Sequence, residues 1–184
     1  MSEPTSEGTR VEISELVASK VLDVPDFPKP GIVFKDLMPL FADGPAFAAT
    51  IDAIVAEHGV DSFDVVAGIE ARGFVVAAAV AYATGKGLVP VRKAGKLPRA
   101  TVAASYTLEY GEAILEVHAD AFLAGERVLV VDDVLATGGT AAATMELVER
   151  AGGQVSGFSV LLELGFLEGR SRIAPRPVHA LLTV

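Results

Sequence analysis

The sequence predicts an α/β fold in which helices cover both faces of a mostly parallel sheet. Three observations carry this prediction. Short apolar or β-branched runs alternate with longer helical segments along most of the chain. Glycine-containing turns join several of these runs to the helices that follow them. Acidic, basic and glycine residues gather just after the apolar runs, at the strand ends where parallel sheets bind their ligands.

The composition limits the classes of protein that the chain can belong to. Its 184 residues fit one domain, and its net charge of −9 argues against a general nucleic-acid binder. Mean hydropathy is +0.47, but the longest apolar stretch, Phe74 to Ala83, is only about half of the ~20 residues that span a membrane. It therefore predicts a buried helix and no membrane partner. The lack of cysteine excludes disulfides and fits a cytoplasmic protein.

The N-terminal part of the chain is expected to be irregular between two helices. Apolar residues at helical spacing predict a first helix that ends before Pro25. Four prolines between residues 25 and 39 predict a stiff segment without a helix. The sequence Asp43-Gly44-Pro45 then has the pattern of a helix start, and that helix is expected to end at Gly59.

The rest of the chain has the pattern of strands and helices in alternation. Strands are expected at 63–68, 88–91, 105–110, 113–117, 127–131, 155–162 and 178–184, and helices at 74–82 and 141–150. The strands 105–110 and 113–117 alternate apolar and polar residues, as antiparallel neighbours do. Residues 93–104 are basic and non-periodic, and they predict a mobile loop.

The segment Val128–Thr140, VLVVDDVLATGGT, carries the strongest chemical signal. Asp132 and Asp133 follow a buried strand and are suited to accept hydrogen bonds from vicinal hydroxyl groups. The sequence Thr137–Thr140 then opens a helix, where free backbone N–H groups and close-approaching glycines favour a phosphate. The segment lacks the lysine of a P-loop and the spacing of a dinucleotide fingerprint. Carboxylates and a phosphate cradle this close together match a ribose 5-phosphate.

The same segment resembles the 5-phosphoribosyl-1-pyrophosphate (PRPP) signature of the type I phosphoribosyltransferases. Five further blocks resemble those of the adenine enzymes, in the same order: Phe27–Leu40, Gly68–Phe74, Val91–Pro98, Ser105–Gly111 and Glu163–Arg170. The resemblance implies the type I phosphoribosyltransferase fold in one domain, 1–184. It would have a small N-terminal hood (roughly 1–45), a core (roughly 46–184) and a flexible catalytic loop (roughly 93–110).

The resemblance implies roles for residues around the sugar phosphate. PRPP and AMP would be bound by Asp132, Asp133, Leu135, Ala136, Thr137, Gly138, Gly139 and Thr140. Pyrophosphate would be bound by Arg72, Arg92, Lys93 and Lys96, with Arg72 also catalytic and Arg92 acting across a dimer interface. The family often has a cis peptide in this pyrophosphate loop, here Glu70–Ala71.

The resemblance also implies a base site and a closing loop. Phe34 would stack on adenine, while the backbone of Val33 and Lys35 reads its edge. Lys35 departs from the arginine that is usual in the family, which puts a side-chain role at this position in doubt. Ser105, Tyr106 and Glu109 would close over the site, with Glu109 as the catalytic group that exchanges a proton with the purine or orients it.

The implied reaction converts adenine and PRPP to AMP and pyrophosphate, with Mg²⁺ held through the substrate and no direct protein ligand. The implied assembly is a homodimer. Two alternatives stay open: a regulatory protein that senses the sugar phosphate, and an enzyme for another purine. A regulator usually carries a nucleic-acid-binding element, and the sequence has no spare domain for one. His58, His118 and His179 lack metal-ligand spacing and are expected to be structural or exposed.

Overall fold

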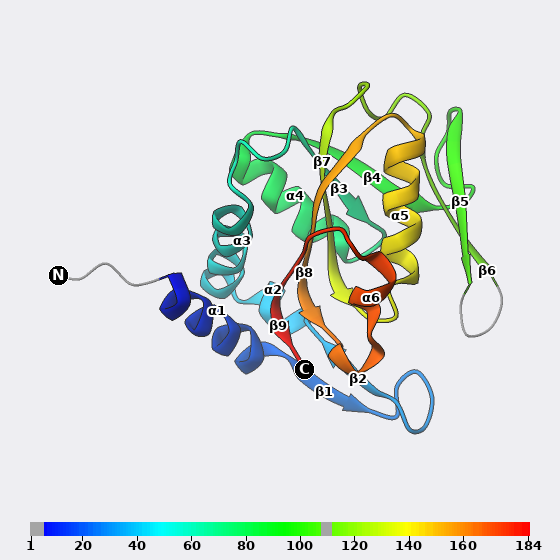
Figure 1. The fold of residues 1–184 in the computed structure, drawn as a ribbon. Helices are drawn as coiled ribbons and strands as arrows, with labels where there is room; N and C mark the ends of the chain where they lie inside the picture. Colours follow the sequence, from blue (N-terminus) through cyan, green and yellow to red (C-terminus); the bar gives the residue numbers. More distant parts are fainter. Residues whose placement is uncertain (1–5, 108–111) are drawn as a thin grey trace.

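The computed structural model describes residues 6–107 and 112–184, and its centre is a seven-stranded sheet with the order β5-β6-β4-β3-β7-β8-β9 (Figure 1). The parallel strands are β3 (Val65–Ile69), β4 (Gly87–Lys93), β7 (Arg127–Leu135), β8 (Gln154–Glu163) and β9 (Val178–Thr183). At one edge β5 (Thr101–Thr107) and β6 (Glu112–His118) form an antiparallel pair. The mostly parallel sheet predicted from the sequence is confirmed.

Helices cover both faces of this sheet, because successive residues of its buried strands point in opposite directions. Val65 and Ala67 of β3 belong to the core beneath α5 (Gly139–Arg150), whereas Val66 belongs to the opposite core. That second core is formed with α1 (Ser6–Lys20), α2 (Met38–Ala42), α3 (Gly44–His58) and α4 (Gly73–Thr84). The 3₁₀ turn η1 (Gly165–Leu167) and α6 (Gly169–Ile173) connect β8 to β9 on the α5 side (Figure 1).

The proline-rich segment is more regular than the sequence predicted. β1 (Leu22–Pro25) and β2 (Val33–Asp36) form a separate two-stranded antiparallel sheet, and α2 follows directly. The prediction was wrong because each proline occupies a position that needs no backbone N–H: Pro25 ends a strand, Pro28 and Pro30 lie between strands, and Pro39 lies in the first turn of α2.

The predicted helices are present, but one is less buried than expected. α3 begins where the sequence indicated, and the side chain of Asp43 caps it by accepting the backbone N–H of Ala46 at 3.0 Å. α4 spans the apolar stretch, yet only one of its faces is buried: Val75 is 47% exposed and Tyr82 is 92% exposed. Among the described residues no helix is long and apolar enough to cross a membrane.

Several strands are longer than predicted, and the differences at β5 and β7 bear on the site. β5 begins at Thr101, so residues 101–104 belong to the sheet and not to a loop. β7 continues to Leu135 because β8 pairs with it as far as Leu135↔Glu163. Asp132 and Asp133 therefore lie within the strand, whereas the sequence placed them after it. They nevertheless extend past the end of β3, whose pairing with β7 stops at Gly68↔Val131.

The topology places a crevice beside β3. The chain passes from β3 through α4 to β4 on one side, and later returns to place β7 on the other side. Connections that leave a strand in opposite directions open a gap at the carboxyl ends of the strands, where open α/β sheets bind ligands. The ends of β3 and β7 meet at this gap, and β2 of the small sheet lies across it (Figure 1).

Candidate active site

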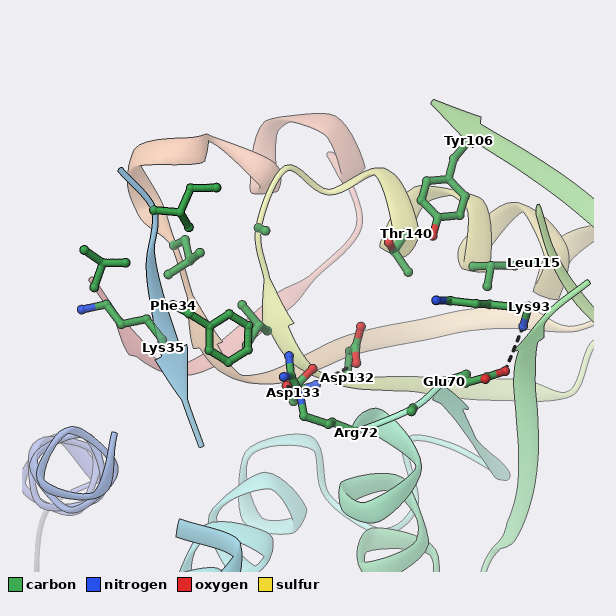
Figure 2. A pocket seen from close by; sticks show the side chains of 16 residues that line it. Phe34, Lys35, Glu70, Arg72, Lys93, Tyr106, Leu115, Asp132, Asp133 and Thr140 are labelled. Carbon is green, nitrogen blue, oxygen red and sulfur yellow. Dashed lines mark hydrogen bonds and ion pairs between the residues drawn. The ribbon is translucent and has the colours of Figure 1, made fainter. Parts of the chain in front are cut away.

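A cavity of about 570 Å³ opens at this edge of the sheet (Figure 2). Most of the segments predicted from the sequence contribute to it, although they are far apart in the chain. Its lining residues are Ile32, Val33, Phe34, Lys35, Glu70, Ala71, Arg72, Lys93, Tyr106, Leu115, Asp132, Asp133, Val134, Ala136, Thr140 and Leu164. The fold therefore brings the predicted base, sugar and pyrophosphate segments to one site.

The two aspartates of β7 lie in different electrostatic surroundings. Asp133 is only 5% exposed, and its carboxylate pairs with the guanidinium group of Arg72. Asp132 accepts the backbone N–H of Asp133 at 2.9 Å. Burial, followed by the negative charge of Asp133, raises the pKa of Asp132 well above its usual value. Both side chains line the cavity, where they can accept hydrogen bonds from hydroxyl groups.

Arg72 lies on the β2 side of the cavity and not among the other cations predicted for pyrophosphate. Its guanidinium carbon is 5.2 Å from the centre of the Phe34 ring, within the range of a cation–π contact. Phe27 packs edge-on against the same ring at 5.2 Å. Arg72 thus links Asp133 to the predicted base-stacking residue (Figure 2).

The predicted base-reading strand β2 presents its backbone to the cavity. Val33, Phe34 and Lys35 all line it. Among the residues that the structure describes, β2 has β1 as its one strand partner, and a strand paired along one edge leaves backbone N–H and C=O groups available along the other. The side chain of Lys35 points away from the cavity (Figure 2), and its amine donates to Asp23 at 2.7 and 2.9 Å.

A smaller hollow of about 70 Å³ lies beside the cavity, and the predicted phosphate loop forms its wall. Its lining residues are Asp132, Val134, Leu135, Ala136, Thr137, Gly138, Gly139, Thr140, Ala141 and Phe158. Gly138 has a left-handed φ of 78°, and α5 begins at the next residue. The unpaired N–H groups of a helix start therefore face a space suited to an anion. Leu135 itself is buried in the core.

The segment after β8 supports this loop, a contact that the sequence analysis missed. A methyl group added at Gly169 would lie 2.0 Å from the carbonyl oxygen of Ala136, and one added at Gly138 would lie 2.4 Å from that of Gly169. Both distances are far below a normal contact, so only glycine fits at either position. Gly169 in the Glu163–Arg170 block was the available signal, but the sequence does not say which segment that glycine contacts.

Three groups at the end of β4 and in the loop after it gather around Glu70, a second residue whose contacts the sequence analysis missed. One carboxylate oxygen accepts the backbone N–H of Lys93 at 3.0 Å, and the other accepts the amine of Lys96. The guanidinium Nε of Arg92 lies 3.5 Å away. The Glu70–Ala71 peptide is cis, as the resemblance implied. The available signal was Glu70 in one block of the resemblance and the basic residues of the Val91–Pro98 block in the next.

The loop after β4 is held from beneath by Glu116 of β6. This buried carboxylate accepts the backbone N–H groups of Lys96 and Leu97, each at 3.1 Å. Further along, Tyr106 reaches the cavity on the side of Thr140 (Figure 2), whereas Ser105 is exposed. Glu109, the predicted catalytic acid or base, lies outside the described residues. Within 6–107 and 112–184, no group of three or more histidine or acidic residues could hold a metal ion.

Comparisons with known proteins agree with this geometry. The phosphoribosyl transferase domain family matches residues 41–176. An adenine phosphoribosyltransferase of Salinispora tropica is 78% identical over 94% of this chain and 92% of its own, and that of Streptomyces coelicolor is 55% identical over the full length of both. The crystal structure of the Saccharomyces cerevisiae enzyme, complexed with an imino-altritol bisphosphate and adenine, covers 94% of this chain and 99% of its own. Its TM-score is 0.89 at 39% identity. The chain therefore belongs to the adenine phosphoribosyltransferases, a family of glycosyltransferase enzymes.

Proposed function

We propose that this chain converts adenine and PRPP to AMP and pyrophosphate within the cavity beside β3. One observation carries the proposal: the cavity and the small hollow share Asp132, Val134, Ala136 and Thr140. The two hollows therefore adjoin, and their linings place an aromatic ring in the cavity, carboxylates where the two meet and the start of α5 in the small hollow. A nucleoside monophosphate has the same order of base, ribose and phosphate.

The sugar phosphate would be anchored by two kinds of group. Asp132 and Asp133 accept hydrogen bonds from the two ribose hydroxyls, and charge-assisted bonds of this kind contribute about 1.5–3 kcal/mol each. The backbone of Ala136–Thr140 holds the 5-phosphate at the start of α5. Anchoring at both positions fixes the anomeric carbon, and positioning of this kind supplies much of the catalysis when no covalent nucleophile takes part.

Adenine would be held between Phe34 and the free edge of β2. Stacking on the aromatic ring orients the base, and the backbone N–H and C=O groups of Val33 and Lys35 meet its donor and acceptor. The N9 nitrogen then attacks the anomeric carbon as the carbon–oxygen bond to pyrophosphate breaks, with the bonding electrons leaving on pyrophosphate. The N9 proton has to leave as well, and the family resemblance makes Glu109, which lies outside the described residues, its proposed acceptor.

The leaving pyrophosphate would be stabilised by Arg92, Lys93 and Lys96. The cavity carboxylates are oxygen ligands of the type that Mg²⁺ prefers. The acidic lining of the cavity therefore fits a Mg²⁺ ion that enters with the substrate. Asp132 and Asp133 would hold that ion through the ribose hydroxyls and water. When bound, Mg²⁺ supplies charge neutralisation for the departing pyrophosphate.

Supplying the purified chain with PRPP, Mg²⁺ and one purine at a time tests the proposed function. We expect AMP from adenine and no nucleotide from hypoxanthine, guanine or xanthine, because backbone groups of β2 and an apolar stack offer no side chain that reads a purine oxygen. Product from another purine alone would overturn the adenine assignment. Ligand binding without any nucleotide product would favour the regulatory alternative.

Two neighbouring variants test how the base is read. Phe34→Ala removes the stacking ring, which is worth about 1–3 kcal/mol per base, and should raise the KM for adenine about tenfold or more. Lys35→Ala should leave that KM within about twofold, since the Lys35 side chain binds Asp23 away from the cavity. A large effect of Lys35→Ala on steady-state kinetics would show that its side chain contributes to the base site.

We further propose that two copies of the chain associate through the outer face of α4. Val75 and Tyr82 are exposed there, and Leu88 of the adjacent strand β4 is 41% exposed. The helix GFVVAAAVAYAT contains no charged residue, so two chains that each carry a net charge of −9 can meet at this face without local repulsion. An isologous contact between two such apolar faces suits a two-fold dimer.

We also propose a cytoplasmic location for the enzyme. The chain has no cysteine among its 184 residues, so its stability makes no use of an oxidising compartment. Fractionation of cells that express the chain should recover it with cytoplasmic enzymes. Recovery with the membrane fraction would contradict this proposal.

A further inference from the structure

Glu70 places a negative charge among the groups proposed to hold pyrophosphate. It follows β3 directly, lines the cavity, and has a side chain that is only 10% exposed. Its carboxylate contacts the Lys96 amine, the Lys93 backbone N–H and the Arg92 guanidinium group. The hydrogen bond from Lys96, aided by that from Lys93, lowers the pKa of Glu70. Glu70 is therefore an anion at neutral pH.

These contacts leave the pyrophosphate cations with a partner before any ligand binds. The Lys96 amine and the Arg92 guanidinium group both contact Glu70, and a phosphate oxygen that approaches either group has to compete with the carboxylate. Glu70 should therefore weaken the binding of pyrophosphate in particular.

We propose that Glu70 competes with pyrophosphate for Lys96 and thereby sets how readily the leaving group is released. This inference rests on the proposed function, since it takes Arg92, Lys93 and Lys96 as the pyrophosphate site. When pyrophosphate leaves, the Glu70–Lys96 ion pair forms again. This ion pair replaces the contact between Lys96 and pyrophosphate and so favours release. Product release limits turnover in many enzymes, and a contact that accelerates it has a direct effect on kcat.

A structural role predicts a different result. Glu70 and Glu116 both contact the loop after β4, and if Glu70 only fastened that loop, its removal would loosen the site and weaken pyrophosphate. A role as a metal ligand would also weaken pyrophosphate on removal, but only when Mg²⁺ is present. Competition for Lys96 predicts that removal of the Glu70 carboxylate tightens pyrophosphate binding. A gain in affinity for pyrophosphate does not arise from a damaged fold.

The test is isothermal titration of the full-length chain with inorganic pyrophosphate, in EDTA and again with Mg²⁺. We expect Glu70→Gln to lower the Kd for pyrophosphate about tenfold, which corresponds to about 1.4 kcal/mol. Its Kd for ribose 5-phosphate should stay within about twofold, because the phosphate hollow does not include Glu70. The matched control is Glu149→Gln, which removes a carboxylate from an ion pair with Arg176 outside the cavity and should change neither Kd.

Lys96→Met provides a second, independent variant. By itself, Lys96→Met should weaken pyrophosphate binding. In a chain that already lacks the Lys96 amine, Glu70 has no amine to withhold from pyrophosphate. Adding Glu70→Gln to Lys96→Met should therefore give much less than the tenfold gain in affinity. Steady-state inhibition should follow the same order, with pyrophosphate a stronger product inhibitor of Glu70→Gln than of the unaltered enzyme. Glu70→Asp, which keeps the charge, should retain weak pyrophosphate binding.

Unchanged or weaker pyrophosphate binding by Glu70→Gln would overturn the proposal, as would a tenfold gain that persists without Lys96. These outcomes are separate from a failure of the proposed function, because binding is measured without turnover. An unaltered chain that makes AMP, together with a Glu70→Gln variant that shows no gain, would refute only the role of Glu70. An unaltered chain that makes no AMP would refute the proposed function whatever Glu70 does.

Discussion

The adjacent aspartates of β7 show how one residue can serve binding at the expense of stability. Asp133 has the Arg72 guanidinium group as its partner, whereas Asp132 is buried beside another negative charge, and its pKa is raised. The folded chain therefore holds the Asp132 proton more tightly than the unfolded chain does. By linkage, stability falls as the pH rises from the ordinary carboxylate pKa through the raised one.

Replacement of Asp132 by Asn should therefore stabilise the ligand-free chain at neutral pH. The amide keeps an oxygen for the backbone N–H of Asp133 and carries no charge. We expect the Tm at pH 7.5 to rise by about 2–4 °C for each 1 kcal/mol of stability that is recovered. The difference in Tm between the variant and the unaltered chain should become smaller as the pH falls toward 4. The variant should also bind PRPP much more weakly. Thermal unfolding followed by circular dichroism measures the first effect, and titration with PRPP the second.

Asp133→Asn is the matched comparison for that prediction. It leaves the Arg72 guanidinium group without its carboxylate partner and should lower Tm. If Asp132→Asn also lowered Tm at pH 7.5, the electrostatic account of the pair would be wrong. Unchanged steady-state kinetics in a variant with both substitutions would contradict the assignment of the sugar-binding site.

At the scale of elements, α6 acts as a rigid support for the phosphate loop. Arg170 holds it in place by pairing with the buried carboxylate of Glu163 at 2.5 Å and donating to the carbonyl oxygen of Val178 at 2.7 Å. This fixes Gly169 directly behind Ala136. The position of the phosphate loop thus depends on α6, although α6 contributes no residue to the lining of the cavity or of the smaller hollow.

Gly169→Ala should displace the phosphate loop and leave the base site intact. The added methyl group would overlap the Ala136 carbonyl group, and we expect the KM for PRPP to rise about tenfold or more while the Kd for adenine stays within about twofold. Gly44→Ala is the control, because a methyl group there meets nothing within 4 Å. Equal losses for both substrates would indicate general unfolding instead, which thermal denaturation would reveal.

The contact between β9 and α3 should make stability sensitive to acid. His179 is buried on β9, its Nε2 3.7 Å from a carboxylate oxygen of Glu57 and its ring 5.8 Å from that of His58. Burial lowers the pKa of His179 to about 4, and the charges of His58, Arg10 and Arg170 add to the effect, while Glu57 opposes it. The unfolded chain, with a pKa near 6.5, then binds the proton more readily than the folded chain.

We therefore expect stability to fall as the pH drops from about 6.5 toward 4, by as much as about 3 kcal/mol from this group. His179→Gln cannot take up the proton, so its free energy of unfolding should change less over the same interval. Urea unfolding at pH 7 and pH 4.5 measures the difference between the two slopes. Parallel slopes for the variant and the unaltered chain would exclude His179 as the cause.

The elements themselves followed from local patterns, and their pairings did not. Apolar runs such as Val128–Val131 can only be buried strands, and Asp43 with Pro45 marks a helix start whatever surrounds it. The extra length of β7 comes from its pairing with β8, and β1 and β2 exist because they pair with each other. Such pairing depends on tertiary contacts that no local window contains.

At the scale of the whole molecule, the contacts within the site also depend on tertiary structure that no local window of sequence contains. The chemistry of one segment predicted Asp132 and the phosphate loop, the family resemblance implied Phe34, and the fold gathers these residues around one cavity. The sequence did not identify the contact of Glu70 with Lys96, which lies 26 residues further along the chain. Which charges meet across a site depends on the sheet order, because that order decides which strand ends are neighbours.

The proposed contact at the apolar outer face of α4 can be tested by its effect on the oligomeric state. Tyr82→Glu would place a charge within the proposed contact, and we expect the chain to become monomeric at micromolar concentration by sedimentation equilibrium. Leu123→Glu, at a position that is 75% exposed between β6 and β7, should leave the association unchanged. A Tyr82→Glu variant that still sediments as a dimer would place the interface elsewhere.

The phosphate hollow has a consequence for inhibitors and for the resistance they select. The binding groups that we propose for it are largely backbone N–H groups of the loop before α5, and a backbone group survives every side-chain substitution. A compound that mimics the phosphate would thus contact a surface with few routes of mutational escape, because Gly138 and Gly169 exclude any larger residue. Resistance should arise instead at β2, where an exposed Val33 and the ring of Phe34 can change without disturbing the sheet.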